Sequence, residues 1–268
     1  MDKILVGADP EVFVRDNKGR LRSAYGLIPG DKKDPFPVVD GAVQVDGMAL
    51  EFNITPAVTP KEFQEKIQKV MRQMEAMVPP IYTIEVIPTA DFHPLHMRAQ
   101  PEEATQLGCE PDYNAYTLAE NVKPDGKVNF RTGSGHVHIG FCDGADPRSE
   151  EHMQRCATLV RHLDVYLGLP SLLWDRDNKR RLLYGKAGAF RPKSYGCEYR
   201  TLSNAWLKDP KLMQYIFNQV QRAVSSLKRG ERFTEAQHTQ IKRFIDQGIT
   251  PSRWTLESYN IQMPPVVA

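Results

Sequence analysis

The hydrophobic and polar positions in the first part of the chain follow patterns that predict β-strands. Residues 4–14 form an apolar run that is interrupted by Asp9-Pro10-Glu11. Pro10 cannot donate a ladder hydrogen bond, so this part of the run is expected at a sheet edge or a bulge. Residues 42–54 alternate well enough for two strands that meet at Asp46-Gly47. These patterns predict a sheet that begins with the first residues of the chain.

Apolar positions recur with helical spacing in later stretches. A clear helix begins at Thr59-Pro60, where proline stands at the first helical position and apolar residues follow every three or four residues. Ser149 caps a second long helix, with acidic residues in its first turn. Asp209-Pro210 and Thr234 begin two more helices near the end of the chain. We expect these last helices to pack against the sheet rather than to carry chemistry.

The stretch 130–141 carries two histidines, His136 and His138, separated by one apolar residue. Side chains alternate between the two faces of a strand, so both imidazoles are expected on one side. A Gly-Ser-Gly segment precedes them and would allow the backbone to approach a ligand closely. A lone histidine is usually structural, whereas a histidine pair on a glycine-flanked strand is more typical of a metal or phosphate site.

A later stretch, 184–206, surrounds one carboxylate with cations. Glu198 and Arg200 are two residues apart in a predicted strand and therefore share a face. A carboxylate that holds a metal, next to cations that neutralise phosphate oxygens, suits a polyphosphate with its metal ion. Ordinary surface ion pairs are the alternative, but similar polar pairs recur on other predicted strands. The cations of this stretch are Lys186, Arg191, Lys193 and Arg200.

Acidic residues on two earlier predicted strands are further candidates. Asp9 and Glu11 can share a face, and like charges so close are costly unless a cation lies between them. A simple Asp-Pro turn explains the same residues equally well. Glu51 lies in an apolar strand and needs a partner, for which a metal is favoured over a basic side chain. Glu110 and Asp112 could also reach a site, but a polar loop is the favoured interpretation.

The overall composition narrows the class of protein. The hydrophobic fraction of 41% and the charged fraction of 25% are ordinary for a soluble globular protein. A formal net charge of +2 indicates no general attraction to nucleic acid or membranes, so any cationic site must be local. The start of the chain lacks a secretory apolar segment, and its four cysteines are widely spaced, which fits reduced thiols in the cytoplasm.

Four motifs taken together resemble the carboxylate–amine ligases of the glutamine synthetase/glutamate–cysteine ligase fold. The closest resemblance is to the small phage-type group called COOH–NH2 ligase type 2. The motifs are D-P-E at residues 9–11, A-L-E-F-N-I-T-P at 49–56, G-S-G-H-V-H-I-G at 133–140, and the stretch 184–204 that ends in C-E-Y-R-T-L-S-N. The last two motifs are specific in combination, whereas D-P-E alone is weak.

The resemblance implies an α+β fold, like the glutamine synthetase catalytic domain, with a mostly antiparallel curved sheet and flanking helices. The concave face of this sheet would bind ATP and a divalent metal, Mg²⁺ or Mn²⁺. The resemblance also implies a single catalytic domain over residues 1–268. Its core motifs would lie within residues 4–206, and a helical C-terminal part would follow at 207–268.

The resemblance also assigns roles to individual residues. The metal ligands would be Asp9, Glu11, Glu51, His136, His138 and Glu198. His136 and His138 would bind metal or phosphate, and Lys186 and Arg191 would bind the nucleotide. The catalytic residues Lys186, Arg191 and Arg200 would face the phosphates and the substrate carboxylate. The chain departs from glutamine synthetase because D-P-E replaces an E-x-E motif and a lysine replaces a usual arginine.

The expected function is therefore ATP-dependent formation of an amide bond through an acyl phosphate. The partners would be a small-molecule or peptide carboxylate and an amine, with no nucleic acid and no membrane, and the oligomeric state stays open. A phage-encoded protein would work in the host cytoplasm. Two alternatives are a zinc or iron enzyme that uses His136 and His138 on a β-scaffold, and a non-catalytic nucleotide-binding protein.

Overall fold

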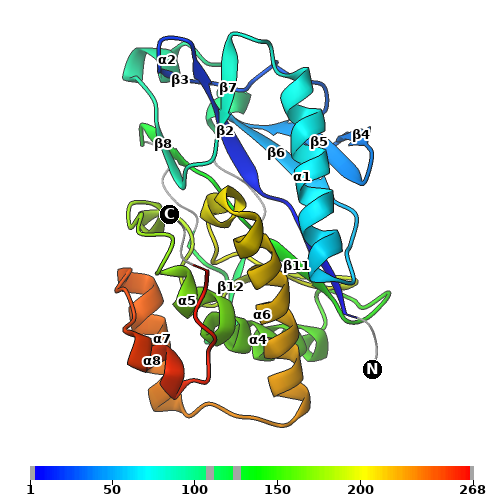
Figure 1. The fold of residues 1–268 in the computed structure, drawn as a ribbon, viewed down its shortest axis with the longest axis vertical. Coiled ribbons are helices and arrows are strands. Elements are labelled where there is room, and N and C mark those ends of the chain that lie inside the picture. The colour runs from blue at the N-terminus through cyan, green and yellow to red at the C-terminus, as the bar shows by residue number, and fades with distance from the viewer. Residues whose placement is uncertain (1–3, 107–111, 123–127, 266–268) are drawn as a thin grey trace.

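The computed structural model describes residues 4–106, 112–122 and 128–265, which form a mixed α+β fold of curved antiparallel sheets and helices (Figure 1). One sheet, in the upper part of Figure 1, has six strands in the order β3-β2-β6-β5-β4, with β7 paired to β2. These strands are β2 (Glu11–Asp16), β3 (Leu21–Arg22), β4 (Phe36–Val38), β5 (Gly41–Asp46), β6 (Ala49–Ile54) and β7 (Tyr82–Glu85). The two strands predicted for residues 42–54 are confirmed as β5 and β6.

Helix α1 (Pro60–Met77) packs against β5 and β6 of the six-stranded sheet. Thr59 caps the helix by accepting a hydrogen bond from the backbone N–H of Glu62 at 3.1 Å, and proline follows at the first position. The apolar stripe predicted from the spacing is buried, with Phe63 among its residues. Two short helices, α2 (Pro94–Arg98) and α3 (Glu102–Thr105), follow later.

The second sheet has five strands in the order β1-β11-β13-β12-β9. They are β1 (Leu5–Ala8), β9 (Tyr113–Asn114), β11 (Val137–Gly140), β12 (Ala189–Lys193) and β13 (Gly196–Tyr199). A separate two-stranded ladder joins β8 (Thr89–Asp91) to β10 (Phe130–Thr132). All the strand pairs named are antiparallel.

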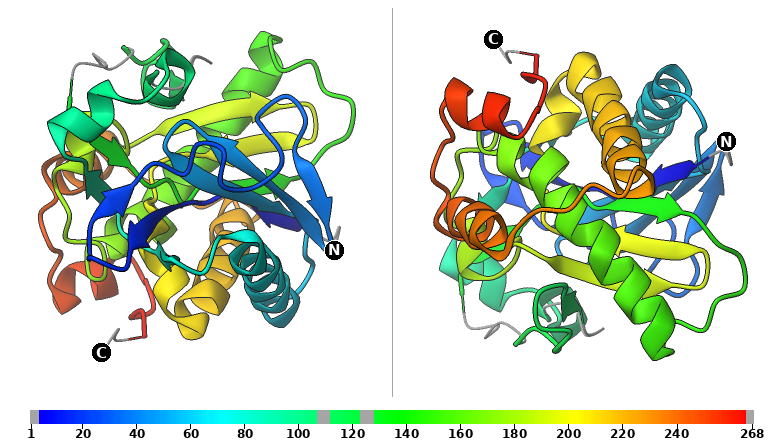
Figure 2. Two further views of the ribbon diagram at one scale, coloured as in Figure 1. Left: turned by 90° about the horizontal axis from the view of Figure 1, so that it is seen from above. Right: turned by 90° about the horizontal axis from the view of Figure 1, so that it is seen from below.

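Helices lie under the five-stranded sheet, as the view from below shows (Figure 2). α4 (Glu150–Leu163) contacts β12 and β13, and it continues through the π-helix Asp164–Gly168 into α5 (Leu169–Ser171). The remaining helices are the 3₁₀ turns Arg180–Leu182 and Asn204–Lys208, and α6 (Pro210–Lys228), α7 (Glu235–Gln247) and α8 (Arg253–Ser258). Thr234 begins α7 as predicted, and it forms a capping box with Gln237.

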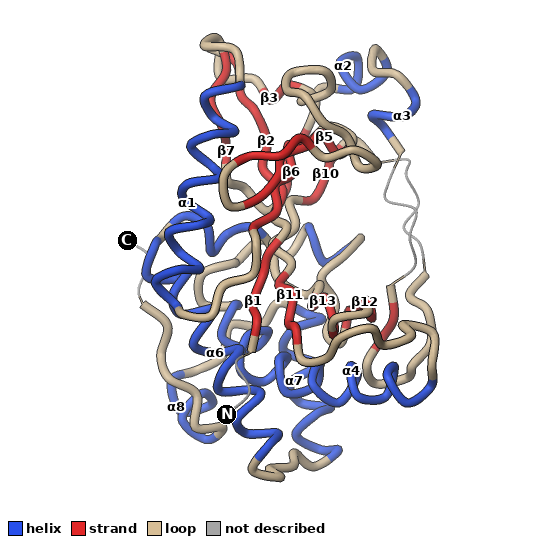
Figure 3. Tube along the Cα trace, turned by 90° about the vertical axis from the view of Figure 1, so that its right-hand side faces the viewer, coloured by secondary structure: helices blue, strands red, loops and turns tan. Residues whose placement is uncertain are grey.

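The two sheets meet where the chain passes from β1 to β2, and Pro10 lies between these strands (Figure 3). β1 is an edge strand of the five-stranded sheet, which agrees with the edge position expected from Pro10. The larger of two clusters of buried apolar residues in the described chain extends from Val6 to Ile261 and includes residues from both sheets and from α6 to α8. The expectation of one catalytic domain over residues 1–268 stays a prediction. In the described part of the chain, no helix has the length and hydrophobicity needed to cross a bilayer.

Candidate active site

A cavity of about 550 Å³ lies where the two sheets meet. Its wall contains carboxylates from the β1–β2 junction and from β5 and β6, and cations from β12 and the segments next to it. The predicted site residues Asp9, Glu11, Glu51, His136, Lys186, Arg191 and Arg200 all line this cavity. His138 and Glu198 lie directly behind the wall, in contact with the residues that line it. The structure therefore brings the predicted residues together in one place.

Strand register explains why His138, Glu198 and Arg191 are neighbours. His138 of β11 is the direct partner of Glu198 in β13, and Glu198 is the direct partner of Arg191 in β12. Directly opposite residues project from the same face of a sheet. The three side chains therefore form one row across three adjacent strands.

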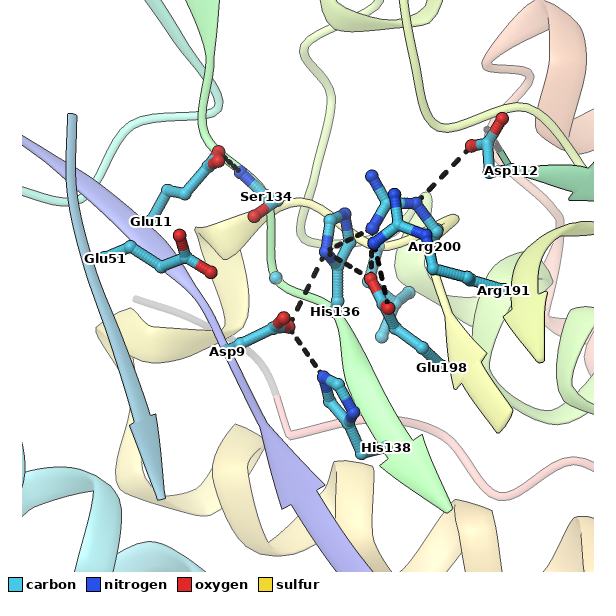
Figure 4. Close-up of polar contacts among 12 residues, drawn as sticks. Asp9, Glu11, Glu51, Asp112, Ser134, His136, His138, Arg191, Glu198 and Arg200 are labelled. Carbon is cyan, nitrogen blue, oxygen red and sulfur yellow. Dashed lines mark hydrogen bonds and ion pairs between the residues drawn. The ribbon is translucent and has the colours of Figure 1, made fainter. Parts of the chain in front are cut away.

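His136 and His138 both reach the carboxylates, as the alternation predicted (Figure 4). His138 Nε2 lies 3.0 Å from Asp9 Oδ1. His136 Nδ1 lies 3.2 Å from Glu198 Oε1 and 3.6 Å from Asp9 Oδ1. We call Asp9, His136, His138 and Glu198 the Glu198 cluster.

Three cations also approach the fully buried Glu198. Arg191 Nη1 and Lys193 Nζ each lie 3.2 Å from Glu198 Oε2, and Arg200 Nη1 donates to Oε1. Burial opposes the ionised form of Glu198, but Arg200 and His136 outweigh it and hold the pKa of this carboxyl well below its ordinary value. Arg200 is also paired with Asp112, whose Oδ2 lies 3.4 Å from its Nε.

Two buried atoms of the Glu198 cluster lack a hydrogen-bond partner within the described chain and could both bind one cation. Asp9 Oδ1 and His138 Nε2 face each other, yet neither makes a hydrogen bond of good geometry. One ligand atom from each of Asp9, His138 and Glu198 lies within 4.8 Å of the others. Burial disfavours imidazolium, but the Asp9 carboxylate outweighs burial and raises the pKa of His138. A carboxylate, an imidazole and a second carboxylate form a donor set that fits Mn²⁺ or Mg²⁺.

A second group of carboxylates, the Glu51 cluster, consists of Glu11, Asp46 and Glu51, whose ligand oxygens lie within 4.8 Å of one another. Glu51 Oε2 accepts from Gln44 Nε2 at 2.7 Å, and Glu11 Oε2 accepts from a backbone N–H at 2.8 Å. Burial and then the neighbouring carboxylates raise the pKa of Glu51 well above its ordinary value, and that of Glu11 is raised for the same reasons. This donor set of three carboxylates also fits a hard divalent cation.

The two-residue spacing of Asp9 and Glu11 suggested that they lie side by side, but the structure separates them. Asp9 joins the Glu198 cluster and Glu11 joins the Glu51 cluster (Figure 4). The reason is Pro10, which interrupts the run so that the strands on its two sides belong to different sheets. The acidic pair therefore serves two positions of one cavity.

The glycines before the histidines have a different use from the one expected. A Cβ on Gly135 would lie 2.1 Å from the carbonyl oxygen of Ser203, and one on Gly133 would lie 2.4 Å from Asn204 Nδ2. The Gly-Ser-Gly segment therefore permits close packing against the chain that follows β13, rather than against a ligand. This packing fixes the segment that leads into His136.

Several residues of the site were not selected from the sequence. The sequence places Asp46 in a turn and favours a polar loop over a site for Asp112, because the partners of both residues are distant in the chain. Glu110 lies outside the described residues. Arg180 is 2% exposed, lines the cavity and donates from Nη1 to the carbonyl oxygen of Thr201 at 2.8 Å and from Nη2 to that of Leu202 at 2.9 Å. No sequence pattern marks these contacts of Arg180. The position of Lys193 on the same face as Arg191, by contrast, can be predicted from their two-residue spacing.

The fold and the site together define an α+β protein with a cavity that combines carboxylates, histidines and clustered cations. The model of the family described as phage phiEco32-like COOH.NH2 ligase-type 2 matches residues 88–246, more than half of the chain. The chain belongs to this family of carboxylate–amine ligases. The matched region includes the histidine pair and Glu198, whereas Asp9, Glu11 and Glu51 precede it.

Among solved structures, a bifunctional glutathione synthetase from Pasteurella multocida has a similar fold, with a TM-score of 0.55 and 11% sequence identity. The alignment covers 92% of this chain but only 41% of that one. A comparison with curated proteins gave no match. The structural likeness supports the fold, and the family match supports the class of enzyme.

Proposed function

We propose that this protein is an ATP-dependent ligase that joins a carboxylate to an amine through an acyl-phosphate intermediate. The observation that carries the proposal is the division of one cavity into a carboxylate side and a cationic side. The Glu51 cluster and Asp9 offer ligands for divalent cations, and Arg191, Lys193 and Arg200 converge on Glu198 next to them. Phosphoryl transfer to a carboxylate needs both, because several negatively charged oxygens must be held close together.

Two sets of residues would hold the divalent cations, Mg²⁺ or Mn²⁺. One is Asp9, His138 and Glu198, with His136 alongside, and the other is Glu11, Asp46 and Glu51. Bound cations would supply positive charge to the phosphate oxygens and orient them. Carboxylate oxygens are the preferred ligands of both ions, and Mn²⁺ also accepts imidazole.

The cationic residues would bind the phosphates and the substrate carboxylate. Arg191 and Arg200 present guanidinium groups that can form paired hydrogen bonds to phosphate or carboxylate oxygens. Lys186 and Lys193 line the same cavity and would add positive charge to the nucleotide phosphates. Positioning of the two reactants, rather than a protein nucleophile, would provide most of the rate enhancement.

The finer features of the fold and substrates belong to the same proposal. An enzyme that synthesises glutathione joins a carboxylate to an amine, and its chain includes a region of similar fold. We infer that the curved sheet is of the glutamine synthetase type, with ATP on its concave face. The substrates would be a small-molecule or peptide carboxylate and an amine.

Calorimetric titration of ATP, with and without Mg²⁺, tests the proposal on the wild type and on Glu198→Gln. Binding that requires Mg²⁺ and weakens in Glu198→Gln would support it. Glu75→Gln is a matched control, because Glu75 is exposed on α1 and should leave binding unchanged. Absence of ATP binding both with Mg²⁺ and in a repeat titration with Mn²⁺ would refute the proposal.

Two further measurements separate the alternatives. Metal analysis of the purified protein would show one tightly bound transition metal if His136 and His138 serve a zinc or iron enzyme. Release of ADP in the presence of candidate carboxylates and amines would distinguish a ligase from a protein that only binds nucleotides. A ligase should release ADP only when both substrates are present or when the acyl phosphate hydrolyses.

A further inference from the structure

Tyr195 occupies a turn that is held against the strand of the histidines. Ser194 and Tyr195 form the two-residue turn between β12 and β13. The carbonyl oxygen of Tyr195 accepts hydrogen bonds from the backbone N–H groups of Phe141 at 2.9 Å and Cys142 at 3.2 Å, directly after β11. Gly196 then adopts a φ of 148°, and a Cβ there would lie 2.0 Å from the carbonyl oxygen of Ile139. The backbone therefore fixes where the phenol can reach.

The phenol oxygen of Tyr195 is hydrogen-bonded to Nδ1 of His138, and the two ring centroids lie 6.0 Å apart. The other ring nitrogen of His138, Nε2, lies 3.0 Å from Asp9 Oδ1. The imidazole thus lies between the phenol of Tyr195 on one side and the carboxylate of Asp9 on the other. The two ring nitrogens therefore face different groups.

Only one neutral form of the His138 ring can bind a metal cation at this position. A neutral imidazole has one N–H and one unshared electron pair, and the ligand nitrogen must be the unprotonated one. If Nδ1 carries the proton, it donates to the tyrosine oxygen, and the electron pair of Nε2 points towards Asp9 and Glu198. The hydrogen bond to the second nitrogen therefore selects the form that can act as a ligand.

We propose that Tyr195 is a positioning residue that accepts a hydrogen bond from Nδ1–H of His138 and so holds Nε2 ready to bind a divalent cation. The inference rests on the proposed function, because it assumes a cation among Asp9, His138 and Glu198. It assigns no contact between Tyr195 and the substrates. Its role is to orient the ring and to keep the proton on the nitrogen that faces away from the cation.

Titration with Mn²⁺ alone, followed by electron paramagnetic resonance, tests this role with Tyr195→Phe, which removes only the hydroxyl group. The dissociation constant for the Mn²⁺ ion that His138 binds should rise by about tenfold or more, the usual effect of losing such an outer partner. Tyr25→Phe is the control, because the hydroxyl of Tyr25 bonds Glu103 instead. Melting without metal should show both variants folded.

Nitrogen NMR of labelled histidines with Mg²⁺ gives a readout that a purely structural role would not change. In the wild type, His138 should carry its proton on Nδ1, and Tyr195→Phe should reduce the fraction in this form. A proton on Nε2 in the Mg²⁺-bound wild type would overturn the inference.

Failure of this inference can be told apart from failure of the proposed function. If His138→Gln removes a Mn²⁺ ion from the wild-type count but Tyr195→Phe binds as tightly as the wild type, only the role of Tyr195 is refuted. If the wild type binds no Mn²⁺ that depends on His138, the proposed metal position itself is refuted, and the role of Tyr195 with it.

Discussion

Glu11 and Glu51 are direct cross-strand partners in β2 and β6. Two carboxylates in this arrangement destabilise a sheet, because their charges are held close together on one face. Asp46 adds a third carboxylate within 4.8 Å. The protein therefore holds negative charge together at a cost in folding stability, which is the arrangement expected where a divalent cation binds.

The first prediction is that Glu51→Gln stabilises the metal-free protein. Removing one of two opposed charges should raise the free energy of unfolding by about 1 kcal/mol, the upper end for cross-strand pairs. The same substitution should abolish much of the stabilisation that saturating Mg²⁺ gives the wild type, about 2.7 kcal/mol at one hundred times the dissociation constant. Urea denaturation with EDTA or with Mg²⁺ measures both effects, and Glu75→Gln should show neither.

The second prediction concerns pH. Because the folded-state pKa values of Glu11 and Glu51 are raised, the folded protein keeps protons that the unfolded chain has lost. Unfolding then releases protons, so stability in EDTA should fall as the pH rises above about 4.5, the ordinary value for glutamate. Mg²⁺ favours the ionised carboxylates and should flatten this slope.

Asp164 contributes to the same slope and has to be separated from it. Burial raises the pKa of this carboxyl to about 7, although Tyr199 and Tyr116 donate hydrogen bonds that oppose the rise. Its contribution should be lost as the pH rises through 7 in every variant. Melting at a series of pH values gives the pH dependence of stability for the wild type and for Glu51→Gln, and the difference between the two isolates the contribution of the Glu51 cluster. The same pH dependence in both proteins would contradict the second prediction.

The third prediction is that Glu198→Gln has the opposite effect on stability to Glu51→Gln. Glu198 is fully buried and is the shared anion of Arg191, Lys193 and Arg200. Its neutralisation leaves these cations to repel one another, and the loss should be about 3 kcal/mol, as for a broken buried ion pair. Urea denaturation in EDTA tests this, and a stabilised Glu198→Gln would show that the cations are compensated elsewhere.

Much of the site could be predicted from local sequence because a strand has a period of two residues. The period places His136 and His138 on one side, and it places Lys193 with Arg191. Pro10 gave the correct expectation of an interrupted strand at a sheet edge, although not the separation of Asp9 from Glu11. Local pattern thus selected residues that the structure brings together, but neither Asp46 nor the division of the residues between the two clusters.

The remaining features depend on strand order and register, which local pattern does not contain. Asp46 belongs to the site because β5 pairs with β6, so that it lies near Glu51 and Glu11. Tyr195 reaches His138 because β13 lies between β11 and β12. Such contacts depend on which strands pair, and the local pattern of a single sequence does not determine that pairing.

The last prediction concerns Gly185 and the buried Arg180. Gly185 has a φ of 78°, and a Cβ there would lie 1.9 Å from Arg180 Nη1, the atom that donates to the carbonyl oxygen of Thr201. Gly144 has a φ of 64°, but a Cβ there would meet no atom of the described chain within 4 Å. The two glycines therefore separate the cost of the backbone conformation from the cost of moving Arg180.

Gly144→Ala should cost about 1 kcal/mol, the penalty of the left-handed conformation, and should leave ADP release unchanged. Gly185→Ala should cost about 3 kcal/mol or more, because it also displaces a guanidinium that forms charged hydrogen bonds. Those bonds hold the backbone next to Arg200, so kcat/KM should fall as well. The double variant Gly185→Ala/Arg180→Lys should lose less stability than the sum of the losses of the two single variants, since both substitutions act through the same side chain. Equal costs for the two glycine variants would show that Arg180 moves aside freely and does not position Arg200.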